Sequence, residues 1–293
     1  MVRTAIINGF GRTLGDGIIG LQALWAAQKI GAIGPRPTLF RLPGLSPLLE
    51  QAYAAAEFAT VDILPWPEST PHWPFAPAAA FQRVIDMRDF AFDPDFRGMS
   101  MLDFFLGKLG ADPASVPPGL RRNIWLRPRI HPWRPRAGGY ILICPQTASQ
   151  LRNMPAAVHD HIKAWFARET GIPVLSQASL PSAGSLAELC GLVAGARLIV
   201  SADTAMIHLA DAFDIPALAF FTTHRPEWRV RDYPGCRAIH LAPEGLPDAL
   251  EFIRGDADIA ACEAAWFSRG ADFAWLDHLL TETWAAAHGR AVP

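Results

Sequence analysis

The sequence predicts an α/β protein with two Rossmann-like domains that face each other across a cleft. Apolar segments of strand length alternate with helical segments in two separate stretches, a pattern typical of parallel sheets with crossover helices. Residues 117–139, between the two stretches, are rich in Pro, Arg and Trp and have neither helical nor strand periodicity, which indicates an interdomain linker. Of the 293 residues, 51% are hydrophobic, enough to form a core in each domain. We therefore expect one domain at 1–130 and a second at 138–270.

The first stretch opens with the apolar strand RTAIIN at residues 3–8. Asp is preferred at helix starts and Gly at helix ends, so the first helix is expected between Asp16 and Gly31. The same reasoning gives strands at 37–42, 59–65 and 82–88, helices at 46–58 and 99–110, and a proline-rich loop at 65–80.

The alternation begins again after the linker. Apolar segments predict strands at 140–145, 172–177, 196–201 and 215–221. The intervening segments predict helices at 155–170, 184–195 and 204–213, and the tail at 257–288 is also expected to be helical. Each stretch therefore has the order of a parallel, doubly wound sheet.

The charge balance and the cysteines restrict the class of protein. The net charge of −2 gives no broad basic surface, so we expect no nucleic-acid partner. The four cysteines lie far apart and form no C-x-x-C pair, which indicates reduced thiols and neither a disulfide framework nor a metal site. With no signal-like start and no apolar run of about 18 residues, the sequence predicts a cytoplasmic protein. Any membrane contact would then be peripheral, at the inner membrane surface.

A glycine-rich turn, NGFGRTLGDG, follows the first strand. Gly9, Gly11 and Gly15 are the residues that a dinucleotide-binding turn would use to approach a pyrophosphate. Such a site also places an acidic residue about 20 positions further on, and residues 17–49 contain none. An arginine such as Arg41 could meet a 2′-phosphate instead, so an NADP-dependent oxidoreductase stays as an unfavoured alternative.

The segment 196–213 combines polar side chains with a helix start. Asp203 follows a strand and can cap the helix that Thr204 opens. Thr204, His208 and Asp211 recur at helical spacing, so a hydroxyl, an imidazole and a carboxylate share one stripe. Free N–H groups at a helix start bind anions, and parallel sheets bind ligands at this edge. An anion site is therefore expected here.

The whole segment 184–223 resembles the C-terminal signature of glycosyltransferase family 9, the heptosyltransferase-like enzymes. In that pattern an acidic residue and a threonine are followed by a histidine four positions after the threonine, as in Asp203, Thr204 and His208. The family's glycine after the threonine is Ala205 here, and its later glycine is replaced by Phe221-Thr222.

Two further segments share the resemblance. The family opens with a strand, a Ser or Thr, and a Gly-Asp pair at the first helix, which here are Thr13, Gly15 and Asp16. Six residues after the aspartate the family usually has a proline, and this chain has Gln22 at that position. The segment ICPQTASQLRNMP, at 143–155, resembles the start of the family's second domain and contributes Thr147 and the basic residue Arg152.

The resemblance implies an inverting, metal-independent enzyme of GT-B architecture that needs no cofactor. It would move a heptose or similar sugar from a nucleoside-diphosphate donor to a glycan, lipid-linked or protein acceptor, in cell-surface polysaccharide biosynthesis. Asp16 would be the general base, with Thr13 and Gly15 on the acceptor side. A C-terminal helix at 271–293 would pack back towards the N-terminal domain. The donor would bind at Thr147, Arg152, Asp203, Thr204, Ala205 and His208.

A second class of function stays open because Ala205, Phe221 and Gln22 depart from the family pattern. A catalytically silent protein of the same fold could bind a nucleotide or glycan and act as an assembly partner. Donor hydrolysis that is lost when Asp16 is replaced would distinguish the enzyme from this alternative.

Overall fold

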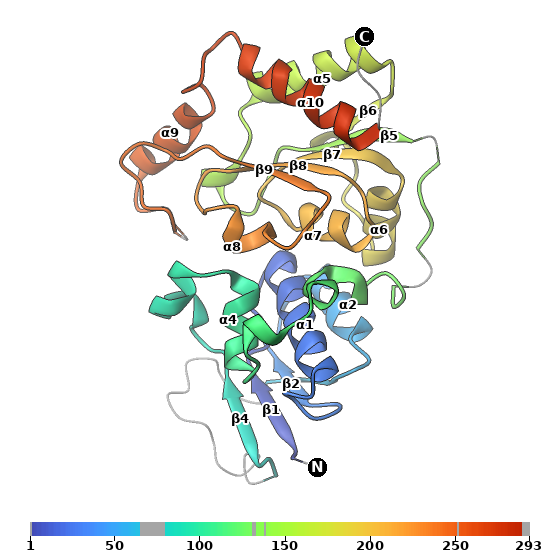
Figure 1. Ribbon diagram of the computed structural model, residues 1–293, viewed down its shortest axis with the longest axis vertical. Helices are drawn as coiled ribbons and strands as arrows, with labels where there is room; N and C mark the ends of the chain where they lie inside the picture. Colours follow the sequence, from blue (N-terminus) through green and yellow to red (C-terminus); the bar gives the residue numbers. More distant parts are fainter. Residues whose placement is uncertain (1, 65–79, 131–132, 138, 251, 289–293) are drawn as a thin grey trace. The chain divides into compact units, whose positions relative to one another are not determined.

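The computed structural model describes residues 2–64, 80–130, 133–137, 139–250 and 252–288. The chain forms two compact units, one of residues 1–132 with 185–187 and one of residues 133–184 with 188–293. Each unit is an α/β layer structure on a parallel sheet, which confirms the predicted fold class (Figure 1). The predicted loop at 65–80 lies almost entirely outside the described residues.

The first unit has four parallel strands in the order β3-β2-β1-β4. Its strands are β1 (Thr4–Ile7), β2 (Thr38–Arg41), β3 (Thr60–Ile63) and β4 (Arg83–Asp86). Its helices are α1 (Leu14–Lys29), α2 (Pro47–Ala55) and α4 (Met101–Lys108). Because the chain adds β2 and β3 on one side of β1 and β4 on the other, the strand order reverses at β1, where open α/β sheets bind ligands.

The second unit has five parallel strands in the order β6-β5-β7-β8-β9. They are β5 (Tyr140–Cys144), β6 (Val174–Ser176), β7 (Ala196–Ala202), β8 (Ala217–Phe221) and β9 (Cys236–His240). The helices are α5 (Ala156–Thr170), α6 (Leu186–Ala194), α7 (Ala205–Ala212), α8 (Glu227–Val230), α9 (Asp256–Ala265) and α10 (Ala274–His288). In this sheet the order reverses between β5 and β7.

Side chains of β8 show why this sheet is covered on both faces. Successive residues of a strand point to opposite faces. Leu218 and Phe220 join a core cluster with α5, α9 and α10, whereas Ala219 and Phe221 pack with residues of α7 and α8. All five residues of β8 are buried, as expected for a central strand of a parallel sheet.

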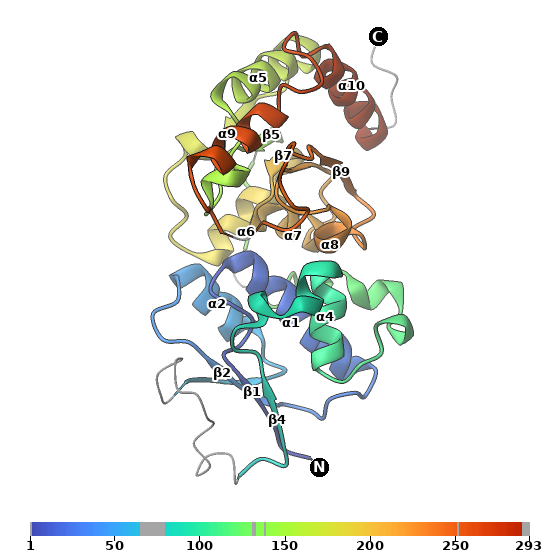
Figure 2. The ribbon, with the colours of Figure 1, turned by 90° about the vertical axis from the view of Figure 1, so that its left-hand side faces the viewer.

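The last helix belongs to the core of the second unit. Leu276, Leu279 and Leu280 of α10 are buried in the same cluster as Ile162 and Phe166 of α5. Figures 1 and 2 both show α5 and α10 side by side. These leucines complete the apolar face of α5. The expectation that residues 271–293 pack back towards the first domain stays a prediction.

Three local features differ from the sequence-based expectation. The edge strand β9 was not predicted, because its residues are half-buried or exposed and carry no alternation. The helical tail is divided into α9 and α10 around Gly270, whose φ of +121° interrupts a helix. Part of the predicted linker belongs to the first unit, since Asn123, Trp125 and Leu126 are buried there.

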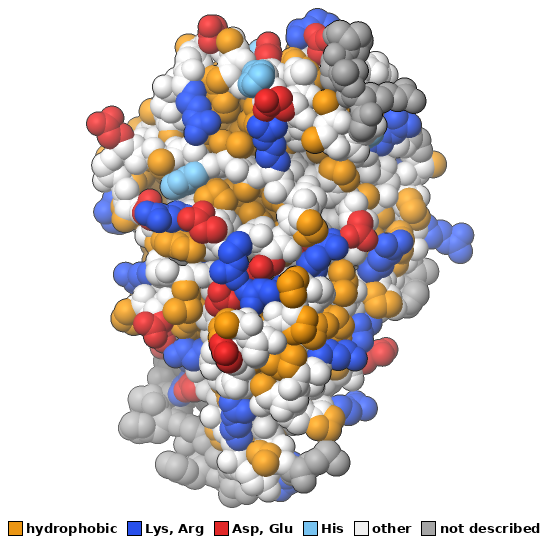
Figure 3. Space-filling view, in the orientation of Figure 1, with side chains coloured by type: hydrophobic (Ala, Val, Ile, Leu, Met, Phe, Trp, Pro, Cys, Tyr) orange, Lys and Arg blue, Asp and Glu red, His pale blue; other side chains and the backbone are white. Residues whose placement is uncertain are grey.

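No helix formed by the described residues has the length and the apolar composition that a membrane crossing requires. Charged side chains of both signs are interspersed over the face shown in Figure 3.

Candidate functional site

The predicted site residues fall into two groups, one in each unit. Thr13, Gly15 and Asp16 lie at the start of α1 in the first unit. The donor-side residues all lie in the second unit, around the ends of β5 and β7: Thr147, Arg152, Asp203, Thr204, Ala205 and His208. Both groups follow the carboxyl ends of strands at a point where the strand order reverses, the usual position of ligand sites in open α/β sheets.

The turn between β1 and α1 is filled by protein side chains. The backbone N–H of Phe10 donates to the hydroxyl of Tyr53 at 2.8 Å, and both side chains are buried. Gly9 has a φ of +60°, and a Cβ there would lie 2.5 Å from the Tyr53 hydroxyl oxygen. A glycine is therefore needed at this position to admit Tyr53, whose hydroxyl takes up the backbone N–H of Phe10 in this turn.

Asp16 lies in the first turn of α1 and is half-buried. Thr13 is the N-cap, and its hydroxyl accepts from the backbone N–H of Asp16 at 3.3 Å. Gly15 lies inside the helix, directly before Asp16. A Cβ on Gly11, whose φ is +85°, would lie 3.2 Å from the carboxylate oxygen Oδ2 of Asp16. Gly11 therefore gives the carboxylate room beside the turn.

Gln22 has a structural role in the same helix. It is 1% exposed and its amide donates to the backbone oxygen of Leu120, in the 3-10 helix Pro118–Arg121. This contact ties α1 to the segment that follows α4. The residue that departs from the family's proline therefore anchors a segment of the first unit.

Arg152 and Asp203 form the central ion pair of the second unit. Arg152 lies in the 3-10 helix Gln150–Arg152 after β5, and its Nη1 lies 3.2 Å from Oδ2 of Asp203, which follows β7. Burial alone would raise the pKa of Asp203, but the electrostatic influence of Arg152, with smaller influences of His224 and Arg229, outweighs burial, and the pKa lies below its ordinary value. The buried carboxylate is therefore ionised and holds the Arg152 guanidinium beside the start of α7.

Thr204 is the N-cap of α7. Its hydroxyl accepts from the backbone N–H of Met206 at 3.1 Å and lies 3.0 Å from the hydroxyl of Ser201. Thr204 and Ala205 are half-buried, whereas the helix residues from Met206 to Ala212 are all buried. The N-terminus is therefore the accessible end of α7, with its first N–H groups and the partial positive charge of the helix.

His208, one of the predicted donor-binding residues, lies on α7 and contacts Tyr233. Its side chain is buried, and Nδ1 lies 2.9 Å from the hydroxyl of Tyr233. Burial lowers the pKa of His208 to about 4, so the ring is neutral near pH 7. A buried, neutral imidazole with a protein partner favours a supporting role beneath the helix start over direct charge neutralisation.

Thr147 and Thr222 hold the segment that carries Arg152. The backbone N–H of Thr147 donates to the Asn153 side chain at 2.8 Å, and its hydroxyl donates to the backbone oxygen of Ser149 at 2.6 Å. From the end of β8, the hydroxyl of Thr222 donates to the backbone oxygen of Leu151 at 2.7 Å. Thr147 is thus a positioning residue, and Thr222, one of the departures from the family pattern, connects β8 to the Arg152 turn.

Sequence reasoning missed His224 and Arg229, which both act electrostatically on Asp203. His224 is buried, and its Nδ1 lies 2.8 Å from the Thr223 hydroxyl. Arg229 lies in the short helix α8. Neither residue belongs to a recognisable motif, so only the fold brings them to Asp203. Among the described residues, no group of three or more His, Cys, Asp or Glu side chains could hold a metal ion.

Comparison with known proteins agrees with this geometry. The family model of glycosyltransferase family 9 (heptosyltransferase) matches residues 169–233, which include Asp203, Thr204 and His208. A search of curated proteins finds no match.

Several solved structures resemble this chain. E. coli heptosyltransferase WaaC with ADP has 16% identity and a TM-score of 0.54, with 90% of this chain and 99% of that chain covered. The iron-containing dodecameric glycosyltransferase TibC from enterotoxigenic E. coli has 15% identity and a TM-score of 0.63, with 99% of this chain and 79% of that chain covered. A family 9 glycosyl transferase from Veillonella parvula has 13% identity and a TM-score of 0.53, with 90% and 97% covered.

The structural likeness shows that the chain has the GT-B fold of these enzymes. The sequence match covers the helix start at Thr204 and Asp203, one partner of the ion pair with Arg152. The chain is therefore similar to the heptosyltransferases of glycosyltransferase family 9, in fold over most of its length and in sequence over residues 169–233.

Proposed function

We propose that this chain is an inverting glycosyltransferase that moves a heptose or similar sugar from a nucleoside-diphosphate donor to a glycan, lipid-linked or protein acceptor. One observation carries the proposal: an arginine, held by a buried aspartate, lies beside the accessible N-terminus of α7 where the strand order reverses. That combination suits a diphosphate. Two of the similar structures contain ADP or ADP-heptose, which makes an ADP-sugar the first donor to test.

On the donor side, Arg152 would neutralise the departing diphosphate. Its side chain is 25% exposed, so the guanidinium can reach a ligand while one nitrogen stays on Asp203. Thr204, Ala205 and the first N–H groups of α7 would bind phosphate oxygens as negative charge develops on the leaving group. His208 and Thr147 would support this surface from below and from the side, through Tyr233 and Asn153.

On the acceptor side, Asp16 would accept the proton of the attacking hydroxyl. Thr13 fixes the helix start on which Asp16 lies, and Gly11, which has no side chain, leaves room for the carboxylate. The positive end of a helix stabilises a carboxylate, so proton transfer would be concerted with attack on the anomeric carbon. Attack from the side opposite the leaving diphosphate inverts the anomeric centre.

We propose that the reaction needs no metal ion and occurs in the cytoplasm. The positive charges of Arg152 and Arg229 and the start of α7 can perform the neutralisation that a divalent cation performs in other transferases. The similar protein TibC is described as iron-containing, so the point has to be tested directly. We expect ADP binding and sugar transfer to be unchanged by EDTA, and a loss of either would show that a metal takes part.

The donor site is tested by titrating ADP into wild-type and variant protein. Arg152→Ala should weaken ADP binding by about 1.5–3 kcal/mol, the usual range for a hydrogen bond to a charged group. Arg168→Ala removes an exposed arginine of the same unit and should leave the affinity unchanged. Equal affinities for wild type and Arg152→Ala would exclude Arg152 from the donor site.

A silent binding protein is the second candidate, favoured by Ala205. This residue places a methyl group at the accessible start of α7 where the family has a glycine. ADP affinity that depends on Arg152, together with no detectable donor hydrolysis or transfer, would support this candidate over the enzyme.

A further inference from the structure

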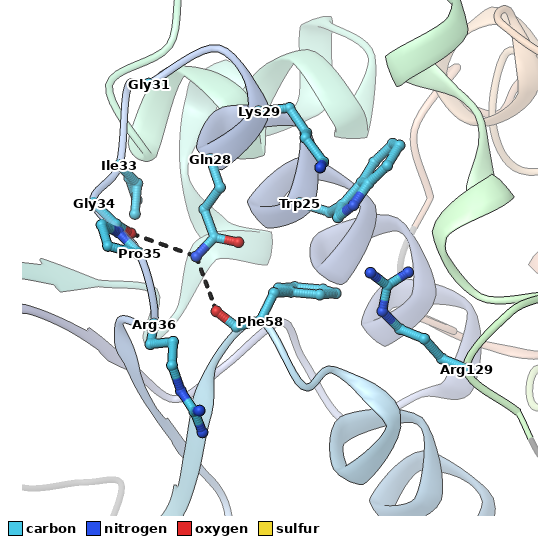
Figure 4. A pocket seen from close by; sticks show the side chains of 10 residues that line it. All are labelled: Trp25, Gln28, Lys29, Gly31, Ile33, Gly34, Pro35, Arg36, Phe58 and Arg129. Atoms are coloured by element: carbon cyan, nitrogen blue, oxygen red, sulfur yellow. Dashed lines mark hydrogen bonds between the residues drawn. The ribbon is translucent and has the colours of Figure 1, made fainter.

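A pocket lies in the first unit, at the edge of the sheet opposite the β1–α1 turn. It is formed by the last turn of α1, the loop that leads into β2, Phe58 before β3, and Arg129 (Figure 4). The cavity has a volume of about 490 Å³, within the size range of small-molecule sites. Asp16 lies at the other end of α1, so this pocket is separate from the proposed acceptor side.

The charged side chains that line the pocket are all basic. The ten lining residues that the structure describes include Lys29, Arg36 and Arg129 and no carboxylate. Figure 4 shows Lys29 and Arg129 directed at the same space, whereas Arg36 extends away from it. Two convergent cations with no lining counter-charge are suited to an anion.

Hydrogen bonds already fix the walls. The side-chain amide of Gln28 donates to the backbone oxygen of Phe58 at 2.9 Å and to that of Gly34 at 3.4 Å. Nη1 of Arg129 donates to the backbone oxygen of Trp125 at 2.6 Å. One guanidinium nitrogen is thus anchored, and the position of the group is set before any ligand arrives.

Two aromatic rings supply the apolar side of the pocket. The ammonium of Lys29 lies 5.9 Å from the centre of the Trp25 ring, and the guanidinium carbon of Arg129 lies 5.5 Å from that of Phe58. Both rings are half-buried, and Phe58 is held edge-on against the buried ring of Trp125 at 5.6 Å. Lysine and arginine stems also cover aromatic rings on ordinary solvated faces. The volume of about 490 Å³ and the hydrogen-bonded walls distinguish this group from such a face.

We propose that this pocket binds a phosphate group attached to a compact ring or chain. Lys29 and Arg129 hold the phosphate oxygens, and Trp25 and Phe58 contact the attached group. The ligand is either a free phosphorylated small molecule or the headgroup of an anionic phospholipid, since both present the same chemistry. The site is independent of the proposed donor site, which lies in the other unit.

Calorimetric titration of glucose 6-phosphate into the full chain tests the free ligand. Saturating ADP is present to occupy the proposed donor site. Lys29→Gln changes an exposed side chain and Arg129→Ala removes the anchored guanidinium, and each should weaken binding about tenfold or more, the usual effect of losing a charge-assisted contact. Arg127→Ala is the matched control, because Arg127 is an exposed arginine of the same segment that does not line the pocket.

Sedimentation with phosphatidylcholine vesicles, with and without phosphatidic acid, tests the lipid source. Retention that requires phosphatidic acid, is lost in Lys29→Gln and persists in Arg127→Ala would identify a headgroup as the ligand. Binding of glucose 6-phosphate with the same dependence would identify a free phosphorylated molecule. Binding of neither probe, or equal losses in Lys29→Gln and Arg127→Ala, would overturn the proposal.

Discussion

At the scale of single residues, the burial of His208 makes a prediction about pH. Burial lowers the pKa of this ring in the folded protein to about 4, whereas an unfolded histidine has its ordinary value of 6.5. Between these values the unfolded chain binds a proton that the folded protein does not, so the free energy of unfolding falls as the pH falls from 6.5 to about 4. The contribution of His208 is at most about 3 kcal/mol.

Denaturant unfolding at a series of pH values measures this contribution. His208→Gln cannot titrate, so its free energy of unfolding should vary less with pH in that window than that of wild type. His278→Gln, which removes an exposed histidine, is the control for the substitution itself. The low pKa of Asp203 affects the free energy of unfolding at lower pH. The stabilisation that its carboxylate provides is lost only as the pH falls below the ordinary pKa of an aspartate. Identical slopes for wild type and His208→Gln would contradict the neutral, buried ring.

At the scale of elements, the N-terminus of α7 should serve both the stability of the helix and the binding of the donor. Thr204→Ala removes the hydroxyl that accepts from Met206 N–H, and should cost about 1 kcal/mol in the free energy of unfolding. The same change should weaken ADP binding, whereas Thr204→Ser should preserve both properties. Unfolding curves and ADP titrations on the same samples measure the two effects.

The N-cap of α2 offers a matched control for this helix start. The hydroxyl of Ser46 accepts from Leu49 N–H in the first unit, so Ser46→Ala should lower stability without changing ADP affinity. An ADP affinity that falls equally in Ser46→Ala and Thr204→Ala would mean that lost stability alone explains the effect of Thr204.

Elements with strong hydrophobic patterns could be predicted from the sequence, and those defined by distant contacts could not. The segments RTAIIN and IPALAFF contain buried central strands, because continuous apolar runs need a sheet covered on both faces. Strand β9 lacks such a run and is formed by pairing with β8. Residues 117–130 contain no periodicity, yet Trp125 and Leu126 are buried by the rest of the first unit. The structure of these two segments is therefore determined by tertiary packing and could not be predicted from the local sequence pattern.

At the scale of the whole molecule, the sequence could identify the family motif but not the supporting residues around it. Three site residues follow predicted strands in recognisable segments: Asp203, Thr204 and Arg152. Because parallel strands end at the same edge of a sheet, the sequence could predict that these residues lie close together. The supporting residues come from other elements, which only the fold brings next to this motif: Thr222, Arg229 and Tyr233. Whether His208 can contact the donor depends on its exposure, which helical spacing alone does not determine.

The proposed reaction requires groups from both units, since Asp16 and Arg152 belong to different units. This division makes a separation of kinetic effects possible. A change at Asp16 should alter the chemical step and leave the binding of the diphosphate intact, whereas a change at Arg152 should alter both.

The kcat of sugar transfer by Asp16→Asn, measured with its ADP affinity, tests the central claim most directly. The amide keeps the shape and the helix position of Asp16, so fold and ADP affinity should match wild type while kcat falls by about 10²–10⁴, the usual contribution of a general base. Asp62→Asn changes an exposed carboxylate of the same unit and should keep the wild-type kcat. A folded Asp16→Asn protein with wild-type kcat would contradict the account.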